Sequence, residues 1–417
     1  MMLEQMISSE EAMLLENEYG AHNYHPLPVV LHKGEGVFVW DVEGKQYYDF
    51  LSAYSAVNQG HCHPKIIHAL VEQAKKLTLT SRAFHNDILG LYEKFVCDYF
   101  DFDKVLPMNT GAEAVETAIK LARKYGYEKR GITPDKAKIV VCHNNFHGRT
   151  TTIISFSNDE TARKNFGPFT EGFISIPYDA PEALKQVLDN DPNVIGFLVE
   201  PIQGEAGVYV PQDGFLAETK RICEDHNVLF IADEVQTGIA RTGKLLAVDY
   251  ENVKPDILIL GKAISGGVYP VSAVFAQNEV MEVIRPGQHG STFGGNPLAS
   301  AVAIAALKVV EEEDLANNAH VLGQIFRDEL TAFAKDHSLI KLVRGKGLLN
   351  AIVIDNSEES NLAWDICLQL KENGLLAKPT HGNIIRLAPP LVMNKKELYE
   401  CISIIKDTIM QIEKRVG

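Results

Sequence analysis

The chain has 417 residues, of which 46% are hydrophobic and 23% are charged, a composition typical of a globular protein. Its formal net charge of −15 argues against a nucleic-acid-binding surface, because contact with phosphates requires clustered basic residues. No apolar stretch of the sequence approaches the roughly 20 residues that a membrane-spanning helix needs. The length predicts two domains, or one large domain with a smaller one attached.

The cysteines and the amino-terminal residues bear on the compartment. Six cysteines are scattered along the chain without a CxxC pair, so we expect free thiols in a reducing compartment. Residues 61–63 (His-Cys-His) lack the second half of a metal site, and we predict no bound metal. Residues 1–20 contain five glutamates and neither lysine nor arginine, which argues against a secretory signal or transit peptide. We therefore expect a cytoplasmic protein.

Two β-rich runs between residues 36 and 50 flank Glu43-Gly44, which predicts a β-hairpin. Beyond about residue 100, apolar β-branched runs alternate with segments of helical periodicity. This pattern predicts an α/β fold with a mainly parallel sheet covered by helices on both faces. The expected strands are Lys138–Cys142, Val194–Val199, Val228–Asp233, Ile257–Leu260 and Val271–Ala276. The expected helices are Ala112–Tyr127, Ala180–Leu188, Phe215–His226 and Ala299–Glu312.

The pattern changes after about residue 300. A long helical region is followed by a β-rich run at 342–354, a helix at 362–373 and a short strand at 384–387. We therefore expect a large α/β domain at 61–300 and a smaller α+β domain at 301–417. The segment 1–60, with its hairpin, is expected to join the smaller domain.

An aspartate and a lysine each follow an apolar strand. Asp233 ends the run at 228–233, and Lys262 follows the run at 257–260 in a glycine-rich turn. Ligands of open parallel sheets bind at the carboxyl ends of strands, so the two side chains are expected to share a site. A lysine amine forms a Schiff base with the aldehyde of pyridoxal 5′-phosphate (PLP), and a carboxylate keeps its pyridine nitrogen protonated. The pair therefore indicates a PLP enzyme.

A phosphate site is predicted at the start of the helix near residue 112. Thr110 and Glu113 have the spacing of a capping box, and Gly111 permits a tight turn before the helix. The first amides of such a helix can bind an anion. Alone, the segment is equally an ordinary capped helix. Together with Lys262, it favours phosphate binding by Gly111 and Ala112.

Four further side chains have both a functional and an ordinary interpretation. Phe146 can stack on a flat ring, and Arg149 can bind a carboxylate through its planar fork. Glu205 lies in a glycine-flanked turn and Arg386 ends a short strand, and both reach a substrate channel if the two domains fold together. The ordinary interpretations are core packing for Phe146 and surface charges for the other three.

Other motifs are weaker. Ser291 and Thr292 lie in a turn-rich segment, where hydroxyl groups either bind phosphate or only support turns. No GxGxxG follows a first strand and no GxxxxGK[ST] occurs, so dinucleotide-binding and P-loop folds are excluded.

Together, these segments resemble the class III, fold-type I PLP-dependent aminotransferases, and within them the ornithine aminotransferase family. The similarity runs from about residue 19 to about residue 404. It is carried by residues 19–28, 54–64, 77–84, 346–353 and 375–382. Residues 19–28 distinguish the ornithine aminotransferase family from the rest of the class, since general members of the class lack a run comparable to Asn-Tyr-His-Pro-Leu-Pro. The resemblance implies a large domain built on a mainly parallel seven-stranded sheet, with a smaller α+β domain.

The resemblance also implies cofactor contacts. Lys262 would be the Schiff-base lysine and proton shuttle, and Asp233 the partner of the pyridine nitrogen. The other implied cofactor-binding residues are Gly111 and Ala112 at the phosphate, Phe146 on the ring, Gln236 near the phenolic oxygen, and Ser291 and Thr292 from the other subunit of a homodimer.

Substrate contacts are implied in the same way. Tyr24 and Arg149 would hold the α-carboxylate end of ornithine, and Tyr54 would shape the pocket. Arg386 would bind the α-carboxylate of glutamate or 2-oxoglutarate. Glu205 would pair with Arg386 while ornithine reacts and then release it.

Two histidines depart from the animal members of the family. His147 stands where those proteins carry tryptophan, and His85 where they carry tyrosine. Both positions lie in segments close to the implied site, so their effect on the kinetics is open.

The implied activity is that of an ornithine–oxo-acid transaminase of arginine and proline metabolism. L-Ornithine and 2-oxoglutarate would give glutamate 5-semialdehyde, which cyclises to pyrroline-5-carboxylate, and L-glutamate in a ping-pong cycle. The nearest alternative is an aminotransferase for N-acetylornithine or 4-aminobutyrate on the same scaffold. A PLP aminomutase would need no oxo-acid acceptor, and a PLP-binding regulator would carry a DNA-binding module, for which no segment is found.

Overall fold

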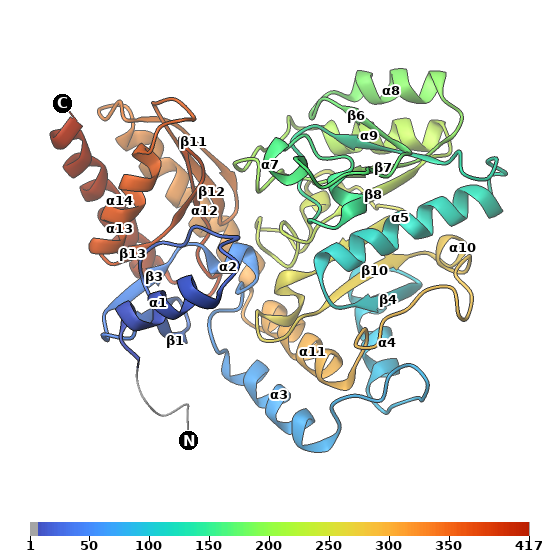
Figure 1. Ribbon diagram of the computed structural model, residues 1–417, viewed down its shortest axis with the longest axis horizontal. Helices are drawn as coiled ribbons and strands as arrows, with labels where there is room; N and C mark the ends of the chain where they lie inside the picture. The colour runs from blue at the N-terminus through green and yellow to red at the C-terminus, as the bar shows by residue number, and fades with distance from the viewer. Residues whose placement is uncertain (1–6, 417) are drawn as a thin grey trace.

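The computed structural model describes residues 7–416, whose strands form three sheets. Figure 1 shows the largest sheet and its helices on one side of the molecule. The carboxyl-terminal strands and helices lie on the other side, together with the amino-terminal strands.

The largest sheet has the strand order β4-β10-β9-β8-β7-β5-β6. Neighbouring strands are parallel except where β10 pairs with β4 and with β9. The expected mainly parallel sheet of an α/β fold is therefore confirmed. Its strands are β4 (Lys104–Met108), β5 (Lys138–Cys142), β6 (Phe173–Ile176), β7 (Val194–Val199), β8 (Leu229–Asp233), β9 (Ile257–Leu260) and β10 (Ser272–Ala276).

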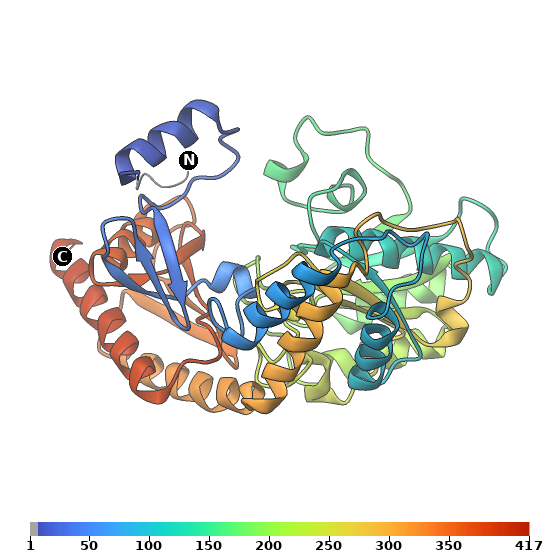
Figure 2. The ribbon, with the colours of Figure 1, turned by 90° about the horizontal axis from the view of Figure 1, so that it is seen from below.

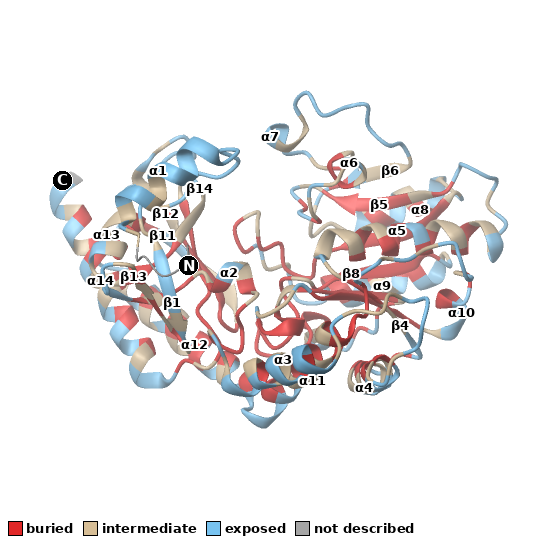
Figure 3. Cartoon of the chain, turned by 60° about the horizontal axis from the view of Figure 1, so that its bottom comes forward, coloured by how far each residue is buried: buried red, intermediate tan, exposed pale blue. Residues whose placement is uncertain are grey.

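Helices cover both faces of this sheet, because alternate residues of its strands enter different cores. In β5, Ile139 and Val141 pack with α5, whereas Val140 and Cys142 pack in the core that holds α4, α8, α9 and α11. Figure 3 shows the central strands buried and the outer faces of the helices exposed. The covering helices are α4 (Leu89–Phe100), α5 (Gly111–Glu128), α8 (Pro181–Asn190), α9 (Phe215–Asp225), α10 (Asn278–Met281) and α11 (Pro297–Glu312).

Two smaller sheets contain the remaining strands. In the first, the predicted hairpin is confirmed, and β13 from the end of the chain pairs in parallel with β3. This sheet has the order β1-β2-β3-β13, with β1 (Leu31–Glu35), β2 (Phe38–Asp41), β3 (Gln46–Asp49) and β13 (Leu375–Leu376). The second has the order β11-β12-β15-β14, with β11 (Ile340–Lys346), β12 (Leu349–Ile354), β14 (Lys378–His381) and β15 (Ile384–Leu387).

The predicted boundary at residue 300 falls inside α11, so one helix spans it. The division into 1–60, 61–300 and 301–417 stays a prediction. The other helices are α1 (Ser9–Tyr19), α2 (Ser52–Ser55), α3 (Pro64–Lys76), α6 (Thr151–Ile154), α7 (Glu160–Arg163), α12 (Leu315–Phe333), α13 (Leu362–Glu372), α14 (Lys395–Val416) and the 3₁₀ turns η1 (Ala247–Glu251) and η2 (Lys262–Ser265). Figure 2 shows α1 and the segment around α7 projecting on the same side of the molecule.

Among residues 7–416, no helix combines the length and apolar character needed to cross a membrane. The same part of the chain contains no group of three or more His, Cys, Asp or Glu side chains arranged to hold a metal ion. The six cysteines are free thiols.

Close backbone contacts join the β11–β12 turn to α12 and to the segment after β8. A Cβ atom at Gly323 in α12 would overlap the backbone oxygen of Gly347 in that turn, and one at Gly347 would overlap the backbone of Thr242. The amide of Leu348 donates to the carbonyl of Arg241 over 3.1 Å. Glycine at 323 and 347 is therefore needed for these segments to approach.

We predict that Gly323→Ala destabilises the protein, although alanine favours helices. The added methyl group would overlap backbone rather than a movable side chain, and overpacking of this kind costs about 1–3 kcal/mol. The matched control is Gly90→Ala in α4, where the methyl group meets nothing within 4 Å. There alanine should be neutral or stabilise by up to about 1 kcal/mol. Thermal unfolding measures both variants, and equal Tm values would contradict the prediction.

Candidate active site

The structure brings Asp233 and Lys262 to one cavity at the carboxyl edge of the large sheet. Asp233 is the last residue of β8, and Lys262 follows the neighbouring parallel strand β9 by two residues. Both line a cavity of about 190 Å³. The other lining residues are Gly111, Ala112, Phe146, His147, Gly148, Glu200, Ile202, Val235, Gln236 and Thr237.

The surroundings of Lys262 lower the pKa of its amine, so that this side chain can act as a base. Its burial lowers the pKa of the amine to about 8, and the nearby Arg386 guanidinium contributes in the same direction. The carboxylate of Glu205 opposes this shift. A substantial fraction of the amine is therefore neutral near pH 7–8, where an ordinary lysine with a pKa of about 10.4 is almost fully charged.

Asp233 is held by two hydrogen bonds. Its Oδ2 lies 2.6 Å from Nδ1 of His147, and its Oδ1 accepts the amide of Val235 over 3.0 Å. Burial disfavours protonation of His147, but the hydrogen bond to Asp233 and the charges of Asp233 and Glu200 outweigh it and raise the pKa of the imidazole. Nε2 of His147 is buried and has no partner within residues 7–416. The arrangement fixes the carboxylate in a water-poor environment.

Glu200 is a site residue that the sequence reasoning missed. It directly follows β7, just as Asp233 ends β8, so the same signal identifies it. Burial raises the pKa of its carboxyl group to about 8, and its Oε2 accepts the amide of Phe146 over 2.9 Å. Glu200 therefore anchors the loop that carries Phe146 and His147.

The capping box predicted at the start of α5 is present, and phosphate binding there stays a prediction. The Thr110 hydroxyl accepts the amide of Glu113 over 3.2 Å, and the Glu113 carboxylate accepts the amide of Thr110 over 2.8 Å. This capping box leaves the amides of Gly111 and Ala112, which line the cavity, without an intrahelical partner. An anion at this position would meet the positive end of the helix dipole.

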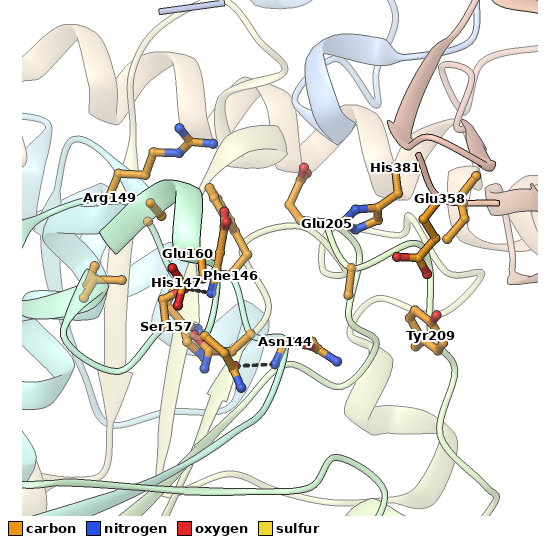
Figure 4. A pocket seen from close by; sticks show the side chains of 18 residues that line it. Asn144, Phe146, His147, Arg149, Ser157, Glu160, Glu205, Tyr209, Glu358 and His381 are labelled. Atoms are coloured by element: carbon orange, nitrogen blue, oxygen red, sulfur yellow. Dashed lines mark hydrogen bonds between the residues drawn. The ribbon is translucent and has the colours of Figure 1, made fainter. Parts of the chain in front are cut away.

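A second, wider cavity of about 360 Å³ adjoins the first and shares Phe146, His147 and Gly148 with it. Figure 4 shows Arg149 on one side of this cavity and Glu205 on the other. The Arg149 guanidinium carbon lies 5.9 Å from the centre of the Phe146 ring. The other labelled side chains are Asn144, Ser157, Glu160, Tyr209, Glu358 and His381.

Glu205, which lines the wider cavity, forms a closed ion pair with Arg386. Nη1 of Arg386 lies 2.6 Å from Oε1 of Glu205, and Arg386 is only 2% exposed. Nε2 of Gln236 donates to the same Oε1 over 3.0 Å. Burial tends to raise the pKa of Glu205, but Arg386, Lys262 and Gln236 outweigh it and lower the pKa. The sequence left the resting state of this pair open, and the structure shows it closed.

Tyr54 lies over this pair, with its ring centre 4.7 Å from the guanidinium carbon of Arg386. It is presented by α2, whose four residues have φ values of 48°, 47°, 61° and 69°. Such left-handed backbone is strained in residues other than glycine. Oδ1 of Asp49 stabilises the turn by accepting the amides of Leu51 and Ser52 over 2.8 and 2.9 Å.

Tyr54 and Arg386, which contact each other, line neither cavity, and the same holds for three further predicted residues. Tyr24 is 68% exposed, although its phenol is close enough to influence the pKa of Tyr54. Ser291 Oγ accepts hydrogen bonds from Asn109 Nδ2 over 2.8 Å and from the amide of Gly294 over 3.1 Å. Thr292 is exposed. The predicted contribution of Ser291 and Thr292 to the site of a second subunit stays a prediction.

Comparison with known proteins agrees with this geometry. The model of the aminotransferase class-III family matches residues 19–409. The chain belongs to this family. Among curated class III relatives, the mitochondrial ornithine aminotransferase of Drosophila melanogaster is 62% identical over 404 residues, which cover 97% of this chain and 92% of the fly protein.

Solved class III structures superpose closely. The ornithine aminotransferase of Toxoplasma gondii ME49 has a TM-score of 0.96 at 49% identity and covers 98% of this chain and 96% of its own. A structure named acetylornithine aminotransferase, from Elizabethkingia anophelis, has a TM-score of 0.90 at 62% identity and covers 97% of this chain and 100% of its own. The class III assignment is thus shared by relatives with two different named substrates.

We predict that Lys262 in cofactor-free protein reacts with an acylating reagent with a pH midpoint of about 8, because only the neutral amine reacts. Lys65 is the internal control, since its hydrogen bond to Glu312 raises the pKa of its amine. Glu205→Gln should lower the Lys262 midpoint further, because the Glu205 charge favours the ammonium form. Peptide mass spectrometry across a pH series measures both lysines, and coincident midpoints would refute the prediction.

Proposed function

We propose that the protein is a PLP-dependent ornithine δ-aminotransferase. It transfers the δ-amine of L-ornithine to 2-oxoglutarate and forms glutamate 5-semialdehyde and L-glutamate. The observation that carries the proposal is the closed Glu205–Arg386 pair beside the Lys262 cavity. The fly and Toxoplasma relatives named ornithine aminotransferase support it.

The residues of the smaller cavity fit PLP. The free amides of Gly111 and Ala112 would bind the phosphate, Phe146 would lie on the ring, and Asp233 would face the pyridine nitrogen. Gln236 would lie near the phenolic oxygen. When bound, PLP supplies an electron sink for charge that develops at the substrate carbon.

Lys262 moves the proton. Its Nζ, whose pKa burial lowers to about 8, would in its neutral form take the proton from the substrate carbon that bears the reacting amine. Nζ would hold that proton as an ammonium and could donate it again within the same cavity. His147 holds the Asp233 carboxylate in place during both steps.

The ion pair selects which amine reacts. A free Arg386 would bind the α-carboxylate of ornithine and bring the α-amine to the reaction centre. With Glu205 in place, Arg386 is neutralised. Ornithine would then be held by its α-carboxylate end at Tyr24 and Arg149, with the δ-amine inward. Tyr54, stacked on Arg386, shapes the pocket between the two positions. In the second half-reaction, the carboxylate of 2-oxoglutarate displaces Glu205 from Arg386.

A second candidate substrate is N-acetylornithine, because the similar Elizabethkingia structure carries that name. An N-acetylated α-amine removes one positive charge and adds bulk at the Arg149 end of the wider cavity. Tyr24 and Tyr54, which are close enough to each other for Tyr24 to influence the pKa of Tyr54, favour a free α-amino acid. 4-Aminobutyrate lacks the α-amino acid group that these residues would bind.

We further propose a homodimer in which Ser291 and Thr292 of each subunit reach the cofactor of the other. Thr292 has an exposed side chain suited to such a contact, whereas Ser291 positions the loop through Asn109. The cytoplasmic location stays a prediction, and the fly relative is named mitochondrial.

We expect L-ornithine alone, without an oxo acid, to remove the visible absorption band of the PLP-loaded protein and to release trappable pyrroline-5-carboxylate. 2-Oxoglutarate should then restore the band. An aminomutase, in contrast, would complete its reaction without an oxo acid. If only N-acetylornithine or 4-aminobutyrate removes the band, the ornithine assignment is wrong while the role of Lys262 stands.

We also predict that Glu205→Ala increases transfer of the α-amine of ornithine relative to the δ-amine by roughly tenfold, equivalent to about 1.4 kcal/mol of orientational bias. The control is Glu218→Ala on the exposed side of α9, which removes the same charge far from the pair. Product analysis by chromatography gives the ratio, and an unchanged ratio would remove the selection argument.

A further inference from the structure

The loop that carries Glu205 lies on one face of the β11-β12-β15 sheet. Ala351 of β12 pairs directly with Arg344 of β11 on one side and with Arg386 of β15 on the other. Residues directly opposite each other in antiparallel strands point to the same face. Arg344 and Arg386 therefore share this face, with the small side chain of Ala351 between them.

Apolar side chains of the loop that carries Glu205 pack against the same face of the sheet. They form a separate buried cluster in which loop residues meet sheet residues, namely Ile202 and Val208 with Leu349, Ala351, Ile384 and Ala388. The backbone of the loop is therefore part of this sheet's packing, although Glu205 acts at the edge of the large sheet.

Both arginines bind this loop. Arg386 binds the Glu205 carboxylate over 2.6 Å. Arg344 donates from Nε to the carbonyl of Gly207 over 2.9 Å, and its guanidinium carbon lies 3.8 Å from the centre of the Tyr209 ring. Figure 4 shows Glu205 and Tyr209 on the same side of the wider cavity.

Gly207 fits this contact closely. It has φ of +118°, and an added Cβ atom would lie 2.7 Å from Cδ1 of Ile384 and 3.0 Å from Nη2 of Arg344. The loop can approach Arg344 at this distance only with glycine at 207. The contact is therefore built into the backbone rather than made by two surface side chains.

We propose that Arg344 is a positioning residue for the Glu205–Arg386 pair, an inference that rests on the function proposed above. Arg344 fixes the loop backbone to the face that carries Arg386, so the closed pair forms with little loss of loop entropy. Opening is then a rotation of the Glu205 side chain and not a displacement of the loop. Arg344 thereby sets how readily a dicarboxylate substrate displaces Glu205.

The proposal predicts the sign of an equilibrium effect. Without the Arg344 contact, the loop samples more conformations and the Glu205–Arg386 pair is weaker. Arg386 is then free more often, and a competing carboxylate binds more tightly. A loss of general stability would instead weaken ligand binding or leave it unchanged.

The test is the Kd of glutarate for the PLP-loaded protein, measured by calorimetry. Glutarate is the five-carbon dicarboxylate that lacks the oxo group, so it cannot react. Arg344→Gln should tighten glutarate binding about threefold to tenfold, the range expected for coupling within one hydrogen-bond network. Arg344→Lys, which keeps a donor for the Gly207 carbonyl, should restore most of the wild-type Kd.

A double-mutant cycle separates positioning from general structure. In a Glu205→Ala background there is no pair to position, so adding Arg344→Gln should leave the glutarate Kd unchanged. Lys341→Gln removes a positive charge from the same strand at an exposed ion pair with Asp355, and controls for long-range charge. An unchanged Kd in Arg344→Gln, or an equal shift in the Glu205→Ala background, would overturn the proposal.

If Arg344→Gln does not fold, Tyr209→Ala replaces it, because it removes the ring on which the guanidinium stacks. Tyr209→Phe, which keeps the ring, is its control. The two proposals can fail separately. Wild-type protein that transfers no amine from ornithine overturns the proposed function, whereas an ornithine-active protein without the Arg344 coupling overturns only this inference.

Discussion

Removal of ionisable groups from water at the carboxyl ends of β7, β8 and β9 controls the chemistry of the site. Parallel pairing of these strands places Glu200, Asp233 and Lys262 at one edge of the sheet, where helices and loops exclude solvent. Burial raises the pKa of the Glu200 carboxyl group to about 8 and lowers the pKa of the Lys262 amine to about 8. Each group can then gain or lose a proton near neutral pH at little cost in free energy.

Two buried arginines show how the surroundings decide between structure and function. Arg241 is fully buried and donates to Asn58 Oδ1 and to the carbonyls of Leu348 and Pro389. These neutral, fixed acceptors connect the segment after β8 to distant parts of the chain, and burial lowers the pKa of this guanidinium to about 9. Arg386 is also buried, but its partner is the carboxylate of the Glu205 side chain, which in the proposed function a substrate carboxylate replaces.

The sequence predicted those parts of the protein that depend on local pattern. β5, β7, β9 and β15 have the predicted bounds. For β5, β7 and β9 the reason is that near-continuous apolar runs specify strands buried on both faces. The positions of Asp233 and Lys262 at strand ends follow from the same runs. The amino-terminal helix α1, the edge strands β4 and β6, and the carboxyl-terminal helix α14 were not predicted, since their patterns are weaker or lie beyond the segments with clear alternation.

Contacts between distant segments could not be predicted from pattern. The pairing of Glu205 with Arg386 was implied only by the resemblance to a known family. That the pair is closed could be learned only from the structure. The left-handed turn that contains Tyr54 has no glycine from which it could have been predicted. The register that aligns Arg344 with Arg386 depends on which strands pair and on the turns that join them, and the apolar pattern of a single strand shows neither.

The pairing of β13 with β3 has a consequence for how the chain folds. Tyr48 and Leu375, near opposite ends of the chain, are neighbours in one sheet. The sheet that contains β1, β2 and β3 therefore cannot be completed until almost the whole polypeptide has been synthesised. The large sheet, whose strands lie between residues 104 and 276, can assemble earlier. Until β13 emerges from the ribosome, the edge of β3 is open to pairing with other chains, so the chain is prone to aggregation during this interval.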